Sequence, residues 1–252
     1  MDWNKILYAE DEKPLDRIID GYSFTSIFRK IAFVGDSMSS GEFESCDENG
    51  NKSYHDMFEY SWGQYIARKN GLTAYNFSRG GMTAKEYIDS FAASNGFWDK
   101  DKACQAYVIA LGANDIFNVK IETGTIDDIN NGNTDTYIGA YAEIVKRYKE
   151  ISPDAKFFFV TLPCDLTFGL KDLLEKTKNA IYDLADYFDN SYVIDLYTYA
   201  PAFDEKFREK YYLYGHMNTM GYLLIAEFVD SYIDYIIRHN TQDFMLIPFV
   251  EH

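Results

Sequence analysis

The sequence predicts an α/β protein, a three-layer α/β/α sandwich in which helices cover both faces of a parallel sheet. Short apolar runs alternate along the chain with longer stretches whose apolar residues recur at helical spacing. The short runs are apolar almost throughout, which is typical of parallel strands buried on both faces. The length of 252 residues fits one α/β domain, and we expect a single domain over residues 1–252.

Five runs are candidate strands, each brief, rich in β-branched or aromatic residues, and bounded by glycine or polar residues. They are Ile31–Gly35, Thr73–Phe77, Ala106–Leu111, Lys156–Thr161 and Tyr192–Leu196. Amphipathic stretches separate and follow these runs, and we expect them to be helices. They are His55–Asn70, Thr83–Phe91, Tyr137–Glu150, Leu170–Phe188 and Thr219–His239.

Four segments lie outside this alternation. Residues 1–30, with a helix expected around Pro14–Asp20, form an N-terminal extension that we expect to pack on the core. The loops Met38–Tyr54 and Ile116–Thr136 exceed the usual loop length, and each is interpreted either as a pocket wall or as a surface insertion. The apolar tail Phe244–Val250 is expected to pack on the core or on a partner subunit, so a homodimer is one expectation.

Charge and cysteine content exclude several classes of protein. The 40 acidic and 24 basic residues give a net charge of −16, which argues against nucleic acid and anionic membranes as partners. No apolar stretch is long enough to span a membrane, and residues 1–18 lack the apolar core of a signal peptide. Three separated cysteines and four scattered histidines show no disulfide or metal-ligand spacing. We therefore expect a reduced, cytoplasmic protein without a metal site.

Chemically active side chains follow the predicted strands. Ligands of an open parallel sheet bind at the carboxyl ends of its strands. The block Gly35–Met38 (GDSM) follows the first strand, Asn76 to Gly81 closes the second, and Gly112–Asp115 (GAND) follows the third. His216 precedes the last helix. A serine, a glycine-rich turn, an asparagine and a histidine are therefore expected to meet at one edge of the sheet.

These residue types are those that acyl transfer requires. A serine hydroxyl becomes an effective nucleophile when a base, usually histidine, takes its proton. The oxyanion of the tetrahedral intermediate needs hydrogen-bond donors placed in advance, which backbone N–H groups beside glycine and an asparagine amide can supply.

The four blocks, in this order, resemble the SGNH hydrolases, also called GDSL-like lipases or acylhydrolases, over roughly residues 31–238. The resemblance implies a flavodoxin-like five-stranded sheet of order 2-1-3-4-5 and hydrolysis of carboxylic esters or thioesters without a cofactor. It also implies that Ser37 is the nucleophile and His216 the base. The oxyanion donors would be the backbone N–H groups of Ser37 and Gly81 and the side chain of Asn114.

One position departs from the family pattern. The family usually places an aspartate three residues before the histidine, and here that residue is Leu213. Removing the equivalent acid from a serine protease lowers turnover by about 10⁴-fold. Three explanations are open: a backbone carbonyl holds His216, another acid such as Asp195 or Glu209 reaches it, or catalysis is impaired.

The sequence thus predicts a serine esterase that acts on a small-molecule or carbohydrate ester. We expect a short acyl group, and a carbohydrate O-acetyl ester is one candidate substrate. The alternative is a non-catalytic ligand- or carbohydrate-binding protein that kept the pocket and lost the acid at Leu213.

Overall fold

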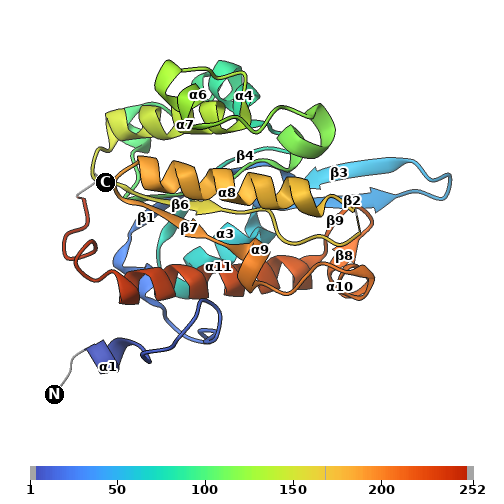
Figure 1. Ribbon diagram of the computed structural model, residues 1–252. Coiled ribbons are helices and arrows are strands. Elements are labelled where there is room, and N and C mark those ends of the chain that lie inside the picture. The colour runs from blue at the N-terminus through green and yellow to red at the C-terminus, as the bar shows by residue number, and fades with distance from the viewer. Residues whose placement is uncertain (1–3, 168, 249–252) are drawn as a thin grey trace.

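A five-stranded parallel sheet forms the middle layer of the computed structural model, which describes residues 4–167 and 169–248 (Figure 1). Its order is β4-β1-β5-β6-β7, and every neighbouring pair is parallel. Counted along the chain within this sheet, the order is 2-1-3-4-5, as predicted. The strands are β1 (Lys30–Gly35), β4 (Thr73–Ser78), β5 (Ala106–Ala110), β6 (Lys156–Val160) and β7 (Ser191–Ile194).

Two helical layers cover the sheet. Helices α3 (Trp62–Asn70) and α11 (Thr219–His239) lie against one face, and α7 (Tyr137–Ile151) and α8 (Lys171–Tyr187) lie against the other (Figure 1). The short helices are α1 (Asn4–Leu7), α2 (Ser37–Ser40), α4 (Ala84–Glu86), α5 (Ala92–Ser94), α6 (Ile126–Asn131), α9 (Leu196–Tyr199) and α10 (Glu205–Tyr211). Two small antiparallel pairs are β2 (Glu42–Cys46) with β3 (Lys52–Asp56) and β8 (Tyr212–Leu213) with β9 (His216–Met217).

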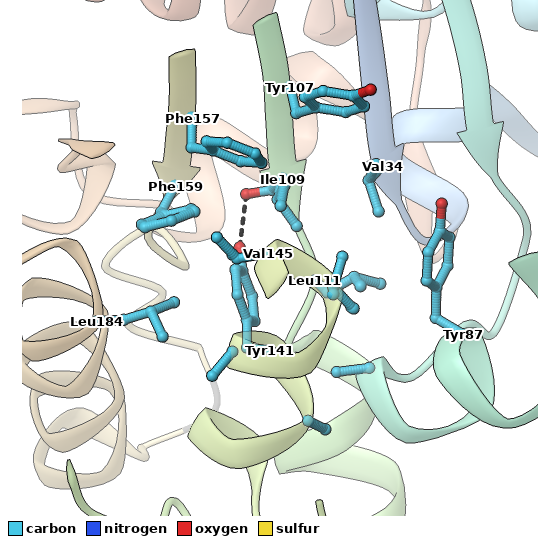
Figure 2. Packing of buried hydrophobic residues seen from close by; sticks show 14 of the residues in the cluster. Val34, Tyr87, Tyr107, Ile109, Leu111, Tyr141, Val145, Phe157, Phe159 and Leu184 are labelled. Atoms are coloured by element: carbon cyan, nitrogen blue, oxygen red, sulfur yellow. Dashed lines mark hydrogen bonds between the residues drawn. The ribbon is translucent and has the colours of Figure 1, made fainter. Parts of the chain in front are cut away.

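Alternating side chains of the sheet build two cores. In β5, Tyr107 and Ile109 point to the α7–α8 layer, whereas Val108 points to the α3–α11 layer. Figure 2 shows the first core, where the Tyr141 hydroxyl of α7 donates a hydrogen bond of 2.6 Å to the carbonyl of Ile109. This pattern follows from the two-residue repeat of a strand, and it explains why the predicted strands are apolar on both faces.

Several predicted element boundaries need correction. His55 and Asp56 belong to β3, and α3 begins only at Trp62, because Ser61 caps the helix by accepting a hydrogen bond of 3.2 Å from the Gln64 N–H. The helix predicted at Thr83–Phe91 is divided into α4, a π-helical segment Tyr87–Phe91 and α5.

The segments outside the alternation also differ from expectation in part. Residues 14–20 form turns instead of a helix. The long loop Met38–Tyr54 contains most of the β2–β3 hairpin, and the loop Ile116–Thr136 contains α6.

Contacts with α11 hold the N-terminal segment. Arg238 of α11 donates hydrogen bonds of 2.7 and 2.9 Å to Glu12, and Asp230 accepts one of 2.7 Å from Ser23.

In the apolar tail, the ring of Phe244 packs on Phe28, Phe158 and Tyr192. Residues 249–250 of that tail lie outside the described residues, and the homodimer stays a prediction. No helix within residues 4–167 and 169–248 combines the length and apolar character needed to cross a bilayer.

Candidate active site

Ser37 lies where β1 turns into α2, at the carboxyl edge of the sheet. Strand β1 ends at Gly35, and Asp36 caps α2 by accepting a hydrogen bond of 3.0 Å from the Met38 N–H. Ser37 is the first residue of α2, so its own N–H has no acceptor within the helix. The sequence predicts Ser37 at this edge of the sheet, and the backbone agrees with that placement.

The glycine turn lies against the turn that carries Ser37. The Arg79 N–H donates to the carbonyl of Gly35 at 3.4 Å, which joins the two turns. Gly81 follows with a φ of +73°, a conformation that side chains other than glycine rarely adopt. Within the described residues, the N–H groups of Ser37 and Gly81 have no protein acceptor, as oxyanion donors require.

Asn114 approaches the same place from the end of β5. Its amide nitrogen lies 3.2 Å from the carbonyl of Met82 and 3.4 Å from a carboxyl oxygen of Asp36. The amide of Asn118 donates a bond of 2.6 Å to the Asn114 side-chain oxygen and fixes its orientation. The side chain therefore presents its N–H₂ group, the donor end, toward the turn that carries Ser37.

Two buried aspartates support these turns. Burial raises the pKa of Asp36 to about 7, and the nearby charges of Asp115 and Glu42 add to this effect, although the Met38 N–H opposes it. Burial likewise raises the pKa of Asp115 to about 6, against the hydrogen bond from the Ala84 N–H. Asp36 therefore acts as a cap and support of the turn.

His216 lies on β9, and its two ring nitrogens contact carboxylates of β2. Nδ1 lies 3.2 Å from Glu44 Oε2, and Nε2 lies 3.0 Å from Glu42 Oε1. The ring of Tyr54 on β3 packs edge-on against the imidazole, with the centroids 5.7 Å apart. The β2–β3 hairpin thus packs against the histidine, and Figure 1 shows it projecting beside β8 and β9.

The two carboxyl groups differ in their surroundings. Burial alone raises the pKa of Glu44, but hydrogen bonds from Lys52, His216 and Gly215 outweigh burial and hold the pKa below its ordinary value. Burial is the largest reason for the raised pKa of Glu42, which the charges of Asp56 and Glu44 raise further and that of His216 lowers.

The acids considered from the sequence lie elsewhere. The carboxyl of Asp195 bonds to Thr161, Tyr182 and the N–H of Thr198. Glu209 is exposed on α10, and the Leu213 side chain is 44% exposed on β8. Within the described residues, the group that contacts Nδ1 is the carboxylate of Glu44 instead of Asp195, Glu209 or a backbone carbonyl. The available signal was the alternation of Glu42 and Glu44, which puts both on one face of a strand.

Ser37 and His216 are brought to the same cavity without a direct bond. Within the described residues, no hydrogen bond joins the Ser37 hydroxyl to the imidazole, because Nε2 contacts Glu42 instead. Such bonds are often long in an unliganded enzyme and tighten when substrate binds.

A cavity of about 480 Å³ is lined by Ser37, Asn114 and His216. Its other walls are mainly apolar and include Trp62, Val160, Leu162, Leu174, Leu196 and Phe203. The Asp165–Arg208 ion pair, with 2.5 Å between the charged atoms, also contributes to the lining. No group of three or more His, Cys, Asp or Glu side chains in the described part of the chain is arranged to hold a metal ion.

Comparisons with known proteins identify a family model and solved structures to which the chain is similar. The model of the GDSL-like Lipase/Acylhydrolase family matches residues 33–224. A search of curated proteins finds no match.

Among solved structures, the chain is similar to a family two carbohydrate esterase from Clostridium thermocellum in complex with cellohexaose. The identity is 20%, the TM-score 0.58, and the match covers 92% of this chain and 66% of that chain. A carbohydrate esterase family 3 protein from Talaromyces cellulolyticus matches with 16% identity and a TM-score of 0.54, over 84% of this chain and 99% of that one. At these identities the likenesses establish a shared fold.

Proposed function

The chain belongs to the GDSL-like lipase/acylhydrolase family, and from this premise we propose that it hydrolyses carboxylic esters with Ser37 as nucleophile and His216 as base. The observation that carries the proposal is the shared cavity, which is lined by Ser37, Asn114 and His216. A nucleophile, a base and an oxyanion donor on one cavity are the parts of an acyl-transfer site.

In the acylation step, the Ser37 oxygen attacks the ester carbon while its proton passes to His216 Nε2. The carbonyl oxygen becomes an oxyanion, and the N–H groups of Ser37 and Gly81 and the amide of Asn114 stabilise it. The tetrahedral intermediate collapses, the bond to the alcohol breaks, and His216 gives its proton to the leaving alkoxide. The products of this step are the free alcohol and an acyl ester of Ser37.

In the deacylation step, His216 takes a proton from water, and the resulting nucleophile attacks the acyl ester of Ser37. The same donors stabilise the second oxyanion, and the proton on His216 returns to the Ser37 oxygen as the bond to serine breaks. The carboxylic acid leaves, and water is the only co-reactant.

The size and the apolar lining of the cavity indicate which acyl groups the substrate carries. The sequence favoured a short acyl group, yet the apolar walls extend from Ser37 to Leu174 and Leu196, leaving room beyond an acetyl group. We expect the alcohol beside His216, where the Tyr54 ring contacts the imidazole and where Tyr54 and Tyr214 are 55% and 56% exposed. Exposed tyrosines present an apolar face with a polar hydroxyl, which suits a sugar. The two carbohydrate esterases of similar fold support a carbohydrate ester.

The rival function is a binding protein without turnover, suggested by Leu213. Its argument was that no acid orients His216, and the carboxylate of Glu44 at 3.2 Å from Nδ1 weakens that argument. The two functions differ in whether the bound ester is consumed.

The test is hydrolysis of a matched series: p-nitrophenyl acetate, butyrate and octanoate, and acetylated cello-oligosaccharides. We expect turnover by the wild type and its loss in Ser37→Ala, with the chain-length preference reporting the use of the apolar cavity. Equal turnover by wild type and Ser37→Ala, or saturable binding without any product, would contradict the proposal and favour the rival.

A further inference from the structure

Two carboxylates contact the imidazole of His216, one at each ring nitrogen. Glu44 Oε2 lies 3.2 Å from Nδ1, and Glu42 Oε1 lies 3.0 Å from Nε2. Both residues belong to β2 and are two positions apart, so their side chains leave the same face of the strand. Proton transfer in a serine hydrolase uses one nitrogen for the serine and the other for the orienting acid, so the two contacts have different consequences.

Glu44 is fixed in place by contacts on both carboxyl oxygens. Lys52 Nζ lies 2.6 Å from Oε1, and the Gly215 N–H donates a bond of 2.9 Å to Oε2. The Glu44 side chain is 2% exposed, and a buried carboxylate is stable only when it is paired and hydrogen-bonded. These partners keep Glu44 ionised beside His216.

Gly215, immediately before His216, leaves space for the carboxylate of Glu44. A Cβ atom at position 215 would lie 2.6 Å from Glu44 Oε2, which is closer than a real Cβ contact. Glycine at this position therefore permits the approach of the carboxylate to Nδ1. Leu213, at the position where the family usually has its acid, is exposed. Glu44 contacts the Nδ1 side of the His216 imidazole instead.

We propose that Glu44 is the acid that positions His216, supplied by the β2–β3 hairpin in place of an acid at residue 213. The proposal rests on the serine hydrolase function proposed above and adds the third member of its triad. A carboxylate at Nδ1 accepts the Nδ1 proton, which leaves the lone pair on Nε2 as the base. The same negative charge stabilises the imidazolium that forms when Ser37 loses its proton.

Glu42 differs from Glu44 in what it can do at Nε2. A neutral imidazole with its proton on Nδ1 has only a lone pair at Nε2, so the contact of 3.0 Å with Glu42 requires a shared proton. Burial raises the pKa of Glu42, which favours that protonated state. For catalysis, Nε2 must exchange Glu42 for Ser37, whereas its partner at Nδ1 stays in place.

Nuclear magnetic resonance of the wild type tests this pairing without any substrate. We expect His216 in the Nδ1–H tautomer, with a strongly downfield Nδ1 proton that disappears in Glu44→Gln and in His216→Gln. An Nε2–H tautomer in the wild type, or a downfield proton unchanged in Glu44→Gln, would overturn the assignment. This result is independent of activity, so it separates a failure of the pairing from a failure of the proposed esterase function.

Kinetics of Glu44→Gln test the consequence for catalysis. We expect kcat/KM to fall by about 10²-fold or more, toward the ~10⁴-fold seen when such an acid is neutralised in a serine protease. Glu209→Gln, which changes an exposed glutamate on α10, is the matched control and should keep wild-type activity. A Glu44→Gln variant within about threefold of wild type would contradict the role.

The pH profile separates positioning from a merely structural role. The charged and titratable groups that face the imidazole are Glu42 and Glu44 of β2 and Tyr54 of β3, with Lys52 paired to Glu44. Removing the Glu44 charge disfavours the imidazolium, so the acidic limb of kcat/KM should move to lower pH by about one unit. A loss of activity with an unshifted limb would mean that Glu44 only supports the fold. If Glu44→Gln does not fold, as judged by circular dichroism, the wild-type tautomer decides the matter.

Discussion

Residues from two regions of the molecule meet at the candidate site, and a different feature of the fold positions the residues of each region. The carboxyl edge of the sheet supplies Ser37 and Asn114 from turns that directly follow β1 and β5. The β2–β3 hairpin lies outside the sheet and supplies Glu44 to His216. The proposed nucleophile and oxyanion donors therefore depend on sheet topology, whereas the proposed partner of the base depends on a hairpin inserted between Ser37 and α3.

Two carboxyl groups, Asp36 of the sheet edge and Glu44 of the hairpin, have pKa values shifted in opposite directions. Burial raises the pKa of Asp36 at the sheet edge, whereas three hydrogen-bond donors keep the pKa of Glu44 in the hairpin below its ordinary value. A carboxyl that keeps its proton can cap a turn beside the oxyanion without adding full negative charge there. An ionised carboxyl at Nδ1 helps the base. The same functional group is thus adapted to two tasks by its surroundings.

The largest expected effect comes from the base that joins the two regions. His216→Ala should lower kcat by about 10⁶-fold, the loss seen when a triad histidine is removed from a serine protease. Burst and steady-state kinetics on an activated ester measure this change. A variant that retains more than about one per cent of wild-type kcat would mean that the hairpin and the sheet edge are not joined through His216.

The second-largest effect is expected from Asn114, which belongs to the sheet edge alone. Asn114→Ala should lower kcat by about 10²–10³-fold with little change in KM, because an oxyanion donor acts mainly in the transition state. Asn118→Ala is the control, since Asn118 only orients the Asn114 amide, and its loss should be smaller. Equal losses in both variants, or a change confined to KM, would argue against an oxyanion role for Asn114.

The electrostatic contrast predicts a pH-dependent stability. Folded Asp36 keeps its proton to about pH 7, whereas unfolded aspartate loses it near 3.8. The folded state binds more protons within this window, so the free energy of unfolding falls as the pH rises through it. Asp36→Asn should remove part of this fall, on the order of a few kcal/mol. Urea unfolding from pH 4.5 to 7.5 measures it, and parallel profiles of wild type and variant would refute the raised pKa.

The smallest effect is expected at the position where the family usually has its acid. Leu213→Ala should leave kcat/KM within about twofold of wild type, because the side chain is 44% exposed and Nδ1 is already paired with Glu44. Steady-state kinetics check this. A large loss would show that residue 213 shapes the base directly, which would weaken the contrast between the two regions.

The part of the site on the sheet edge was predictable because local sequence defines it. An apolar run that ends at Gly35 places Ser37 beyond the strand, and a second run places Asn114 beside it. Parallel pairing then brings both turns to one edge whatever the details of the helices.

The hairpin was not predictable in the same way. Residues 42–56 are polar, and all of β3 is exposed, so no apolar alternation marks its strands. The contact between Glu44 and His216 joins residues 172 positions apart, and no local pattern encodes it. The helix expected from His55 is present from Trp62 onward, and only its start was wrong, because His55 and Asp56 pair with β2.

The most direct test of the central claim is labelling with a fluorophosphonate probe, which reacts with an activated serine. Intact mass and peptide mapping should find one probe per wild-type chain, on Ser37, with labelling lost in Ser37→Ala and strongly slowed in His216→Ala. Circular dichroism confirms that the variants are folded. A well-folded wild type that takes up no label, or that carries the label on another serine, would contradict the account.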